Sequence, residues 1–325
     1  MNFQITVLLI SFVVSVVCGI IVIPILRRLK VGQIERDDGP QSHLKKQGTP
    51  TMGGIIMILV MLIMSVFLFF KYRTTDPEII HKLIPLVFVT IGFGLVGFVD
   101  DFKKLILKNT KGLKPMYKMF GLLIISVIYT VYLVKVLNIG TETYIPIVKT
   151  YINFPIWLYI PFAIFVLLGT TNAVNLTDGI DGLSTSVTTI ILTCLVSISI
   201  IMGVTEITLV GTVLIGACLG FLLFNIHPAK VFMGDTGSLL LGGAISGIAL
   251  YLKMPLILIV IALIPVIETL SVIIQVLYFK KTGKRVFKMA PIHHHFELCG
   301  WKEGKVVSVF SIITLILCVI GISII

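Results

Sequence analysis

Residues 169–184, GTTNAVNLTDGIDGLS, interrupt an otherwise apolar chain with four oxygen-bearing side chains. They recur at every third position, as Asn172, Asn175, Asp178 and Asp181. Residues three apart are neighbours on a helix surface, so a helical segment gathers all four on one stripe, although Gly179 and Gly182 loosen the backbone there. Such a stripe suits a hydrated divalent cation or a sugar nucleotide. The alternative is a polar connector whose Asn and Asp side chains satisfy helix ends.

The composition around this stretch is that of a membrane protein. Of the 325 residues, 57% are hydrophobic and only 13% are charged, whereas soluble domains average about 25% charged residues. We therefore expect an all-α polytopic integral membrane protein, folded as a single domain over residues 1–325. A spanning helix needs roughly 20 apolar residues. Ten such stretches occur, at about 4–26, 52–70, 82–99, 119–138, 156–172, 184–203, 207–225, 237–252, 255–278 and 305–325. We expect 4–26 to be a retained first span and not a signal peptide.

The net charge of +11 is distributed by topology and does not indicate nucleic-acid binding. Twenty of the 26 Lys and Arg residues lie in four alternate connectors, at 27–50, 100–118, 225–237 and 278–305. Cytoplasmic connectors carry such an excess, so both termini are predicted to face the extracytoplasmic side. Basic residues beside a bilayer also attract anionic lipids and phosphorylated substrates. Nothing in the sequence resembles the aromatic-interleaved strand of a nucleic-acid-binding module.

Two of the acidic candidates, Asp100 and Asp101, end the third span. Acidic groups at the membrane edge are costly and usually functional. Helix capping does not account for them, because acids at a helix C-terminus oppose the macrodipole. The pair suits a general base, a nucleophile or a metal ligand. A further acid, Asp235 in FMGDTGS, precedes the eighth span, where its alternative role is an N-cap.

The ninth span contains Pro265 and Glu268. Proline removes a backbone hydrogen bond, so we expect this helix to be bent or broken. A carboxylate within a span is a functional candidate by default. The alternative is that Glu268 satisfies backbone groups freed by the kink.

Basic, hydroxyl and aromatic candidates lie in the same connectors. Lys45 and Lys46 could meet a diphosphate to which Thr49 or Thr51 donates, although positive-inside anchoring is the ordinary role of such lysines. The connector after Asp101 adds Lys103, Lys104, Lys108, Lys111, Lys114 and Lys118, which form either a phosphate-attracting rim or a topological lock. Phe232 could stack on a base or anchor the membrane interface.

Three consecutive histidines, His293, His294 and His295, occupy the last connector. Neighbouring residues on a helix point about 100° apart, so all three cannot bind one ion. One or two of them could instead donate to phosphate or carry protons.

All these clusters are predicted to lie on the cytoplasmic face. Oxygen-only acids favour Mg²⁺ or Mn²⁺ over zinc, and the five cysteines form no CxxC pair that would suggest zinc or disulfides. Metal-assisted phosphoryl transfer from a nucleotide-activated donor to a lipid phosphate fits this combination. A transporter is the competing class, favoured by a broken helix with a charge in the membrane. Against it, the acids gather at one surface and no inverted halves are visible.

Five motifs resemble, in order, those of the polyprenyl-phosphate N-acetylhexosamine-1-phosphate transferases. They are GTPTMGG (48–54), FVDDFKK (98–104), NAVNLTDGIDGL (172–183), FMGDTGS (232–238) and PIHHHFE (291–297). The resemblance runs from about residue 27 to residue 305. PIHHHFE together with KKQGTPTMGG is similar to the branch that uses UDP-MurNAc-pentapeptide, while branches that use UDP-GlcNAc differ in the last connector.

The resemblance implies a bacterial plasma-membrane enzyme with ten spans and a cytoplasmic catalytic cleft, which depends on Mg²⁺ and often forms a homodimer. It implies transfer of phospho-MurNAc-pentapeptide from its UDP carrier to undecaprenyl phosphate, which gives UMP and the first lipid intermediate of peptidoglycan synthesis. A UDP-GlcNAc-dependent transferase is the alternative within the family.

The resemblance also implies roles for individual residues. Asp235 is expected to be the Mg²⁺ ligand, with Asp100 and Asp101 also catalytic. The substrate-binding residues are expected to be Lys46, Thr51, Lys104, Lys118, Asn172, Asn175, Asp178, Asp181, Phe232, His293, His294 and His295. The choice between direct attack by the lipid phosphate and a covalent aspartyl intermediate stays open at this point.

Overall fold

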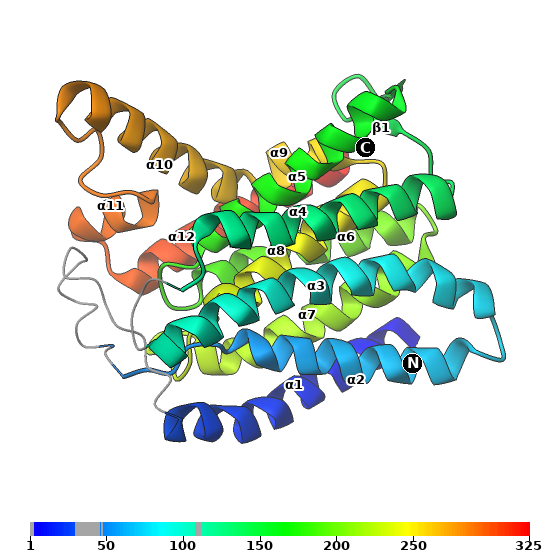
Figure 1. Ribbon diagram of the computed structural model, residues 1–325, viewed down its shortest axis with the longest axis horizontal. Coiled ribbons are helices and arrows are strands. Elements are labelled where there is room, and N and C mark those ends of the chain that lie inside the picture. Colours follow the sequence, from blue (N-terminus) through cyan, green and yellow to red (C-terminus); the bar gives the residue numbers. More distant parts are fainter. Residues whose placement is uncertain (1–2, 30–45, 47, 108–111) are drawn as a thin grey trace.

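A computed structural model of the protein describes residues 3–29, 46, 48–107 and 112–325. Long helices run side by side along the bundle (Figure 1). The elements in chain order are α1 (Phe3–Arg28), α2 (Gly54–Tyr72), α3 (Pro77–Leu107), α4 (Pro115–Val131), η2 (Tyr132–Val136), β1 (Glu142–Ile145), β2 (Thr150–Asn153), α5 (Ile156–Thr177), α6 (Leu183–Ile201), α7 (Thr205–Asn225), α8 (Gly234–Tyr251), η3 (Pro255–Ile257), α9 (Leu258–Ile261), α10 (Leu263–Thr282), α11 (Ile292–Leu298) and α12 (Glu303–Ser323).

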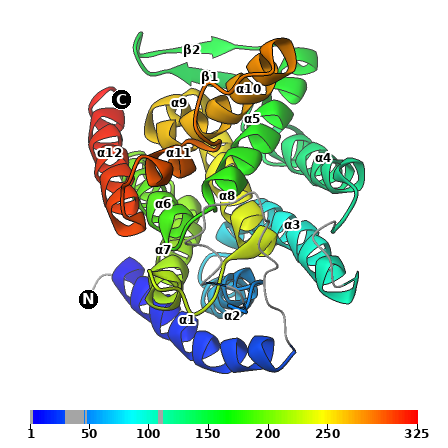
Figure 2. The ribbon, with the colours of Figure 1, turned by 90° about the vertical axis from the view of Figure 1, so that its left-hand side faces the viewer.

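The expectation of an all-α polytopic membrane protein is confirmed. In the part of the chain that is described, nine helices are long and apolar enough to cross a membrane. They correspond to the predicted stretches except 237–252, which forms α8. Glycine and hydroxyl residues make α8 less apolar than the others, and every residue from Thr236 to Tyr251 is buried. In Figure 2, α8 lies in the middle of the bundle, with other helices around it.

Glycines let neighbouring helices approach α8 closely. A Cβ atom added at Gly54 on α2 would collide with the backbone of Gly237. One added at Gly97 on α3 would collide with the carbonyl oxygen of Asp235. Near the C-terminal end of α8, the Tyr129 hydroxyl donates a 2.7 Å hydrogen bond to the carbonyl of Gly247. These contacts fix the start of α8 against α2 and α3, where the acidic residues lie.

The predicted break in the ninth span is present. The helix divides at Ala262, whose φ of −106° and ψ of 27° are not helical, and α10 begins at Leu263. Pro265 therefore falls in the first turn of α10, where its missing N–H needs no partner. Beyond the break α10 diverges from the rest of the bundle (Figure 1).

Two small elements were not expected from the sequence. β1 and β2 form an antiparallel hairpin in the connector before α5, with Glu142 opposite Asn153. The short helix α11 carries the three histidines and lies at the opposite end of the bundle (Figure 1). The C-terminus lies at the hairpin end, where the Tyr144 hydroxyl contacts the carbonyl oxygen of Ile325 at 3.2 Å.

Candidate active site

Three carboxylates from two helices form the first part of the site, called here the carboxylate cluster. Asp100 and Asp101 lie in the last turns of α3, and Asp235 is the second residue of α8. One oxygen from each lies within 4.8 Å of the others. The sequence predicted that these distant acids meet, and the structure brings them together.

The backbone around Gly234 makes this approach possible. Gly234 has a φ of +73°, and a Cβ atom there would lie 2.7 Å from Asp101 Oδ2 and 2.9 Å from Thr51 Oγ1. A side chain is therefore strained at this position for both conformational and steric reasons. The 50–54 segment is held alongside it, because the amides of Gly53 and Gly54 donate to the carbonyls of Phe232 and Met233. Thr51 consequently lies beside the cluster.

Two lysines compensate the charge of the carboxylate cluster. The Nζ atom of Lys104 lies 2.6 Å from Asp100 Oδ2, 3.4 Å from Asp101 Oδ1 and 2.9 Å from Asp235 Oδ2. Lys118, on α4, approaches the same oxygen of Asp235 at 2.9 Å. Without these cations three neighbouring carboxylates would repel one another.

Neutral donors orient each carboxylate separately. Asp101 Oδ2 accepts hydrogen bonds from the backbone N–H of Thr236 at 2.9 Å and from its hydroxyl at 2.7 Å. The amide of Leu113 donates to Asp100 Oδ1 at 2.7 Å. Asn175 Nδ2 donates to Asp235 Oδ1 at 2.8 Å and lies 2.8 Å from Ser238 Oγ. The cluster is therefore pre-organised by α3, α5 and α8, and its hard oxygen donors fit a divalent cation such as those bound by carboxylates elsewhere.

The four polar side chains of residues 169–184 do not form one stripe. α5 ends at Thr177, Asp178 follows as its C-cap, and α6 starts at Leu183. The four polar residues consequently separate, and the expectation of a shared stripe is wrong. Asn172 bonds locally to the carbonyl of Leu168 at 2.8 Å and is not brought to the carboxylate cluster.

Asp178 lies near Asp101 and Asp235 of the carboxylate cluster and near Asp181. Burial raises the pKa of its carboxyl group to about 8, and the nearby negative charges of Asp235 and Asp101 contribute. A group with this pKa holds its proton at neutral pH in the absence of a cation. It could then donate a hydrogen bond that an ordinary aspartate cannot.

Asp181 belongs to a second group, called here the Lys46 cluster, which comprises Lys46, Asp181, His227 and Glu303. Lys46 Nζ lies 2.7 Å from Asp181 Oδ1 and 2.6 Å from Glu303 Oε1. Although burial opposes its charged form, hydrogen bonds to the two acids raise the pKa of Lys46 above its usual value. The Lys46 ammonium also lies 6.0 Å from the centre of the Phe232 ring.

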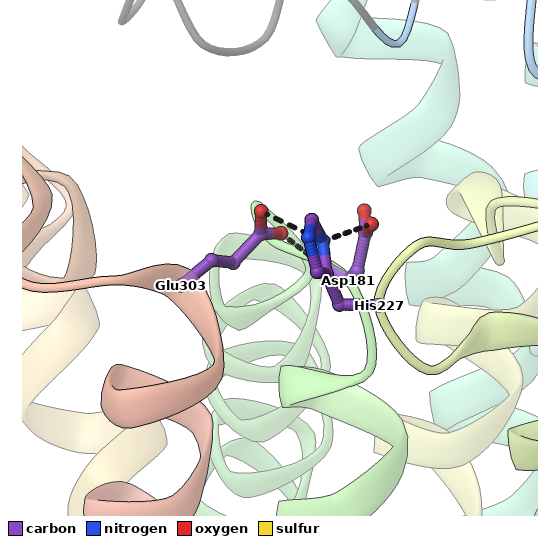
Figure 3. Close-up of side chains that lie close together, drawn as sticks. All are labelled: Asp181, His227 and Glu303. Carbon is purple, nitrogen blue, oxygen red and sulfur yellow. Dashed lines mark hydrogen bonds and ion pairs between the residues drawn. The ribbon is translucent and has the colours of Figure 1, made fainter.

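Figure 3 shows the other members of the Lys46 cluster. His227 Nδ1 lies 3.0 Å from Asp181 Oδ2 and 3.3 Å from Glu303 Oε2. The backbone N–H of Asp181 donates to Glu303 Oε1 at 2.6 Å. The cluster thereby ties the loop after α5 to the loop before α8 and to the start of α12. Lys45 lies outside the described residues.

Sequence reasoning missed His227 and Glu303 as site residues. His227 follows a span, stands beside Pro228 and precedes the FMGDTGS motif. Glu303 is the first residue of α12. The helix dipole favours an acid at that position, so its presence there does not by itself indicate a functional site. The only available signal was that both residues lie in connectors that carry the other candidates.

The three histidines have three different environments. His293 is fully buried and faces Glu268, so its side chain has no surface with which to contact substrate in this structure. His294 Nδ1 lies 2.8 Å from Glu297 Oε2. His295 Nδ1 accepts a 3.1 Å hydrogen bond from the backbone N–H of Lys288. The structure thus separates His293 from the two half-buried histidines that follow it.

Comparison with known proteins agrees with the motifs. Residues 83–253 match the family described as Glycosyl transferase family 4. The chain is 50% identical to a phospho-N-acetylmuramoyl-pentapeptide-transferase of Acetivibrio thermocellus, over 97% of this chain and 93% of the relative. Proteins with the same description from Clostridium botulinum and Clostridium perfringens are both 52% identical, over 97% of this chain and 94% and 96% of their own lengths. With this identity over nearly its whole length, the chain belongs to the phospho-N-acetylmuramoyl-pentapeptide-transferase family.

Proposed function

We propose that this protein transfers phospho-MurNAc-pentapeptide from UDP-MurNAc-pentapeptide to undecaprenyl phosphate and releases UMP. A phosphate oxygen of the lipid attacks the β-phosphorus of the nucleotide. The bond from that phosphorus to the bridging oxygen breaks, and the oxygen leaves with UMP. The observation that carries the proposal is the carboxylate cluster, bridged by Lys104 and Lys118, at one end of an apolar helical bundle.

Mg²⁺ is the proposed cofactor of this reaction. Asp235 is the ligand we assign, because the ammonium groups of Lys104 and Lys118 both lie 2.9 Å from its Oδ2 atom. Asp100 and Asp101 supply further oxygens within reach. A divalent cation bound there neutralises diphosphate charge and stabilises the departing phosphate, an effect worth roughly several kcal/mol.

The protein's own residues perform the remaining tasks. Asp100 orients the lipid phosphate or accepts its proton, and the Leu113 amide holds its carboxylate in place. Asp101 is held by both donors of Thr236 and maintains the negative charge that draws Lys104 inward. Lys104 and Lys118 meet the phosphates as these displace the carboxylates from the ammonium groups. We favour direct attack over an aspartyl intermediate, because the backbone N–H groups of Leu113 and Thr236, which the phosphates do not displace, occupy one oxygen of Asp100 and one of Asp101.

The Lys46 cluster is the proposed binding region for the nucleotide. Phe232 presents a ring on which a base can stack, worth about 1–3 kcal/mol. Asp181 can accept from the N–H of a uracil, and Lys46 can meet a uracil or phosphate oxygen. Asp178, Asn175 and Thr51 lie toward the carboxylate cluster and would contact the diphosphate and sugar, with His294 and His295 on the outer side.

The surroundings proposed for this site come from the basic connectors and the resemblance. We propose a multi-pass protein of the bacterial plasma membrane, with the site open to the cytoplasm and to the inner leaflet. An apolar lipid chain would then lie in the bilayer while its phosphate reaches Asp100. Two copies of the chain are proposed to associate as a homodimer.

The test is to identify both products of the purified protein in detergent or liposomes. Mass spectrometry should find UMP and the lipid-linked diphosphate sugar in equal amounts, and only when both substrates are present. Uptake of a substrate into vesicles without chemical conversion would instead support the transporter. Conversion of UDP-GlcNAc in place of UDP-MurNAc-pentapeptide would support the alternative branch.

A further inference from the structure

Glu268 carries an ionisable carboxyl group inside α10, a helix that is apolar enough to span a membrane. It is the sixth residue of α10, which begins after the break at Ala262, and it is completely buried. The catalytic roles proposed above do not use it. Burying a carboxylate without a partner costs free energy. The groups that face Glu268 therefore indicate its role.

The partner of Glu268 is His293 on α11. Its Nδ1 atom lies 3.1 Å from Glu268 Oε1, and its backbone N–H donates to Glu268 Oε2 at 3.4 Å. Both side chains have 0% exposure. The two side-chain atoms lack the geometry of a hydrogen bond, so the 3.1 Å approach is a close polar contact that places the imidazole ring against the buried carboxylate. α11 is thereby held to α10 across the loop that connects them.

The opposite edge of the ring abuts the site. A Cβ atom added at Gly179 would collide with His293 Nε2, so the imidazole lies directly against the Gly179 backbone. Among the described residues, this nitrogen has no hydrogen-bond partner. Gly179 follows Asp178, which faces the carboxylate cluster, and lies two residues before Asp181, which holds Lys46.

We infer that His293 is a positioning residue: held by Glu268, its ring supports the 178–181 loop and so sets Asp178 and Asp181 relative to each other. The inference rests on the proposed function, because these two aspartates act in the proposed substrate site. It assigns Glu268 the role of orienting His293. It also gives the first histidine of the motif a different task from His294 and His295.

The contact with Gly179 offers a test by complementary changes. Gly179→Ala places a methyl group where the imidazole stands, and its backbone is not in the left-handed region, so the clash with His293 is the main consequence. A displacement of about 1 Å near a reacting centre can cost on the order of 100-fold in rate, and we expect this loss in kcat/KM. His293→Asn keeps a donor near the Nδ1 position but vacates the space at Nε2. The kcat/KM of the double variant Gly179→Ala/His293→Asn should therefore be at least about tenfold higher than that of Gly179→Ala alone, which is half of the expected loss on a logarithmic scale.

Gly169→Ala is the matched control. Gly169 lies on α5, the helix that leads into the 178–181 loop, and a Cβ atom there meets no other atom within 4 Å. It should retain the activity of the unchanged protein. If Gly179→Ala is equally active, or if the double variant is no better than Gly179→Ala, the supporting role of the ring is wrong. The second outcome would indicate that the imidazole itself contacts substrate.

A second series covers the case in which Gly179→Ala does not assemble. Glu268→Gln keeps the size of the side chain and an oxygen for the His293 backbone N–H, so its activity should stay within about threefold of the unchanged protein. Glu268→Ala should lose activity as His293→Ala does, by up to about 100-fold. Removing both side chains should cost no more than removing either, since they act as a unit. Multiplying losses would contradict the inference.

Thermal unfolding separates this inference from the proposed function. If the unchanged protein releases no UMP, the proposed reaction fails. The same variants then test the contact alone: the Tm lost in Gly179→Ala should return in the double variant. Failure of that recovery would overturn the packing argument whatever the reaction is.

Discussion

Lys104 Nζ lies 2.9 Å from Asp235 Oδ2, although 131 residues separate the two in sequence. Lys104 comes from the last turn of α3, and Asp235 from the first turn of α8. The lysine thus acts as an internal counter-ion at the position where the proposed cation and diphosphate would bring their own charges. Binding would exchange one set of ionic contacts for another and leave no carboxylate uncompensated.

Replacing the two lysines should produce unequal losses. Lys104→Met removes contacts to three carboxylates and Lys118→Met a contact to one. Truncating one partner of a close charged pair costs about 2–5 kcal/mol, so we expect kcat/KM to fall by roughly 30-fold or more for Lys104→Met. The fall should be smaller for Lys118→Met. Steady-state UMP release measures both.

The exposed Lys114, in the same connector, provides the control. Lys114→Met should change kcat/KM by less than about twofold, as expected for a solvated charge. The double variant Lys104→Met/Lys118→Met should lose less than the product of the single losses, because both lysines share one oxygen of Asp235. An equal loss for Lys114 would point to general attraction of anions and not to specific contacts.

Asp178 should make stability depend on pH. Its folded-state pKa of about 8 exceeds the ordinary value of 3.8, so the folded protein binds a proton that the unfolded chain releases. The resulting stability is present at low pH and declines as pH rises from about 4 to about 8. Asp178→Asn cannot titrate and lacks this decline. Its Tm advantage over the unchanged protein, measured with EDTA present, should therefore grow between pH 5 and pH 8.

Asp76→Asn serves as the comparison for that measurement, because Asp76 lies in the turn between α2 and α3 at the far end of both helices. Its Tm difference should stay constant over the same range. A flat difference for Asp178→Asn would show that the carboxyl group is already ionised at neutral pH.

Glu303 should affect nucleotide binding more than chemistry. It holds Lys46 and the Asp181 backbone, and it lies outside the carboxylate cluster. Hydrogen bonds to charged groups contribute about 1.5–3 kcal/mol, so Glu303→Ala should raise the KM for the nucleotide substrate roughly ten- to 100-fold. The change in kcat should be smaller. Lys302→Ala, at the exposed neighbouring residue, should leave KM unchanged, and a purely kcat effect of Glu303→Ala would remove it from the nucleotide site.

Most of the fold follows from the positions and lengths of the apolar stretches in the sequence. Spans need about 20 apolar residues, and this requirement located the long helices, although α3 runs on to Leu107 and α10 begins only at Leu263. The break before Pro265 followed from the missing N–H of proline. The hairpin at β1 and β2 did not follow, because two four-residue strands in a short connector have no distinctive pattern.

The site was predictable only in part. Asp100, Asp101 and Asp235 were identified by their acidity at membrane edges, and their convergence was expected. Periodicity misled at Asp181, since a three-residue spacing implies a stripe only while the helix continues, and α5 ends at Thr177. Glu303 and His227 acquire their roles from tertiary contacts between loops, which no local pattern reveals.

The most direct test of the central claim is UMP release by the unchanged protein and by Asp235→Asn, each with Mg²⁺ and with EDTA. Asn has the size of Asp but lacks its charge, so the variant should assemble with a comparable Tm. We predict that EDTA abolishes turnover of the unchanged protein and that Asp235→Asn loses about 1,000-fold with Mg²⁺ present, corresponding to roughly 4 kcal/mol of lost charge stabilisation. Near-normal turnover of Asp235→Asn, or activity unaffected by EDTA, would contradict a cation-dependent transfer at the carboxylate cluster.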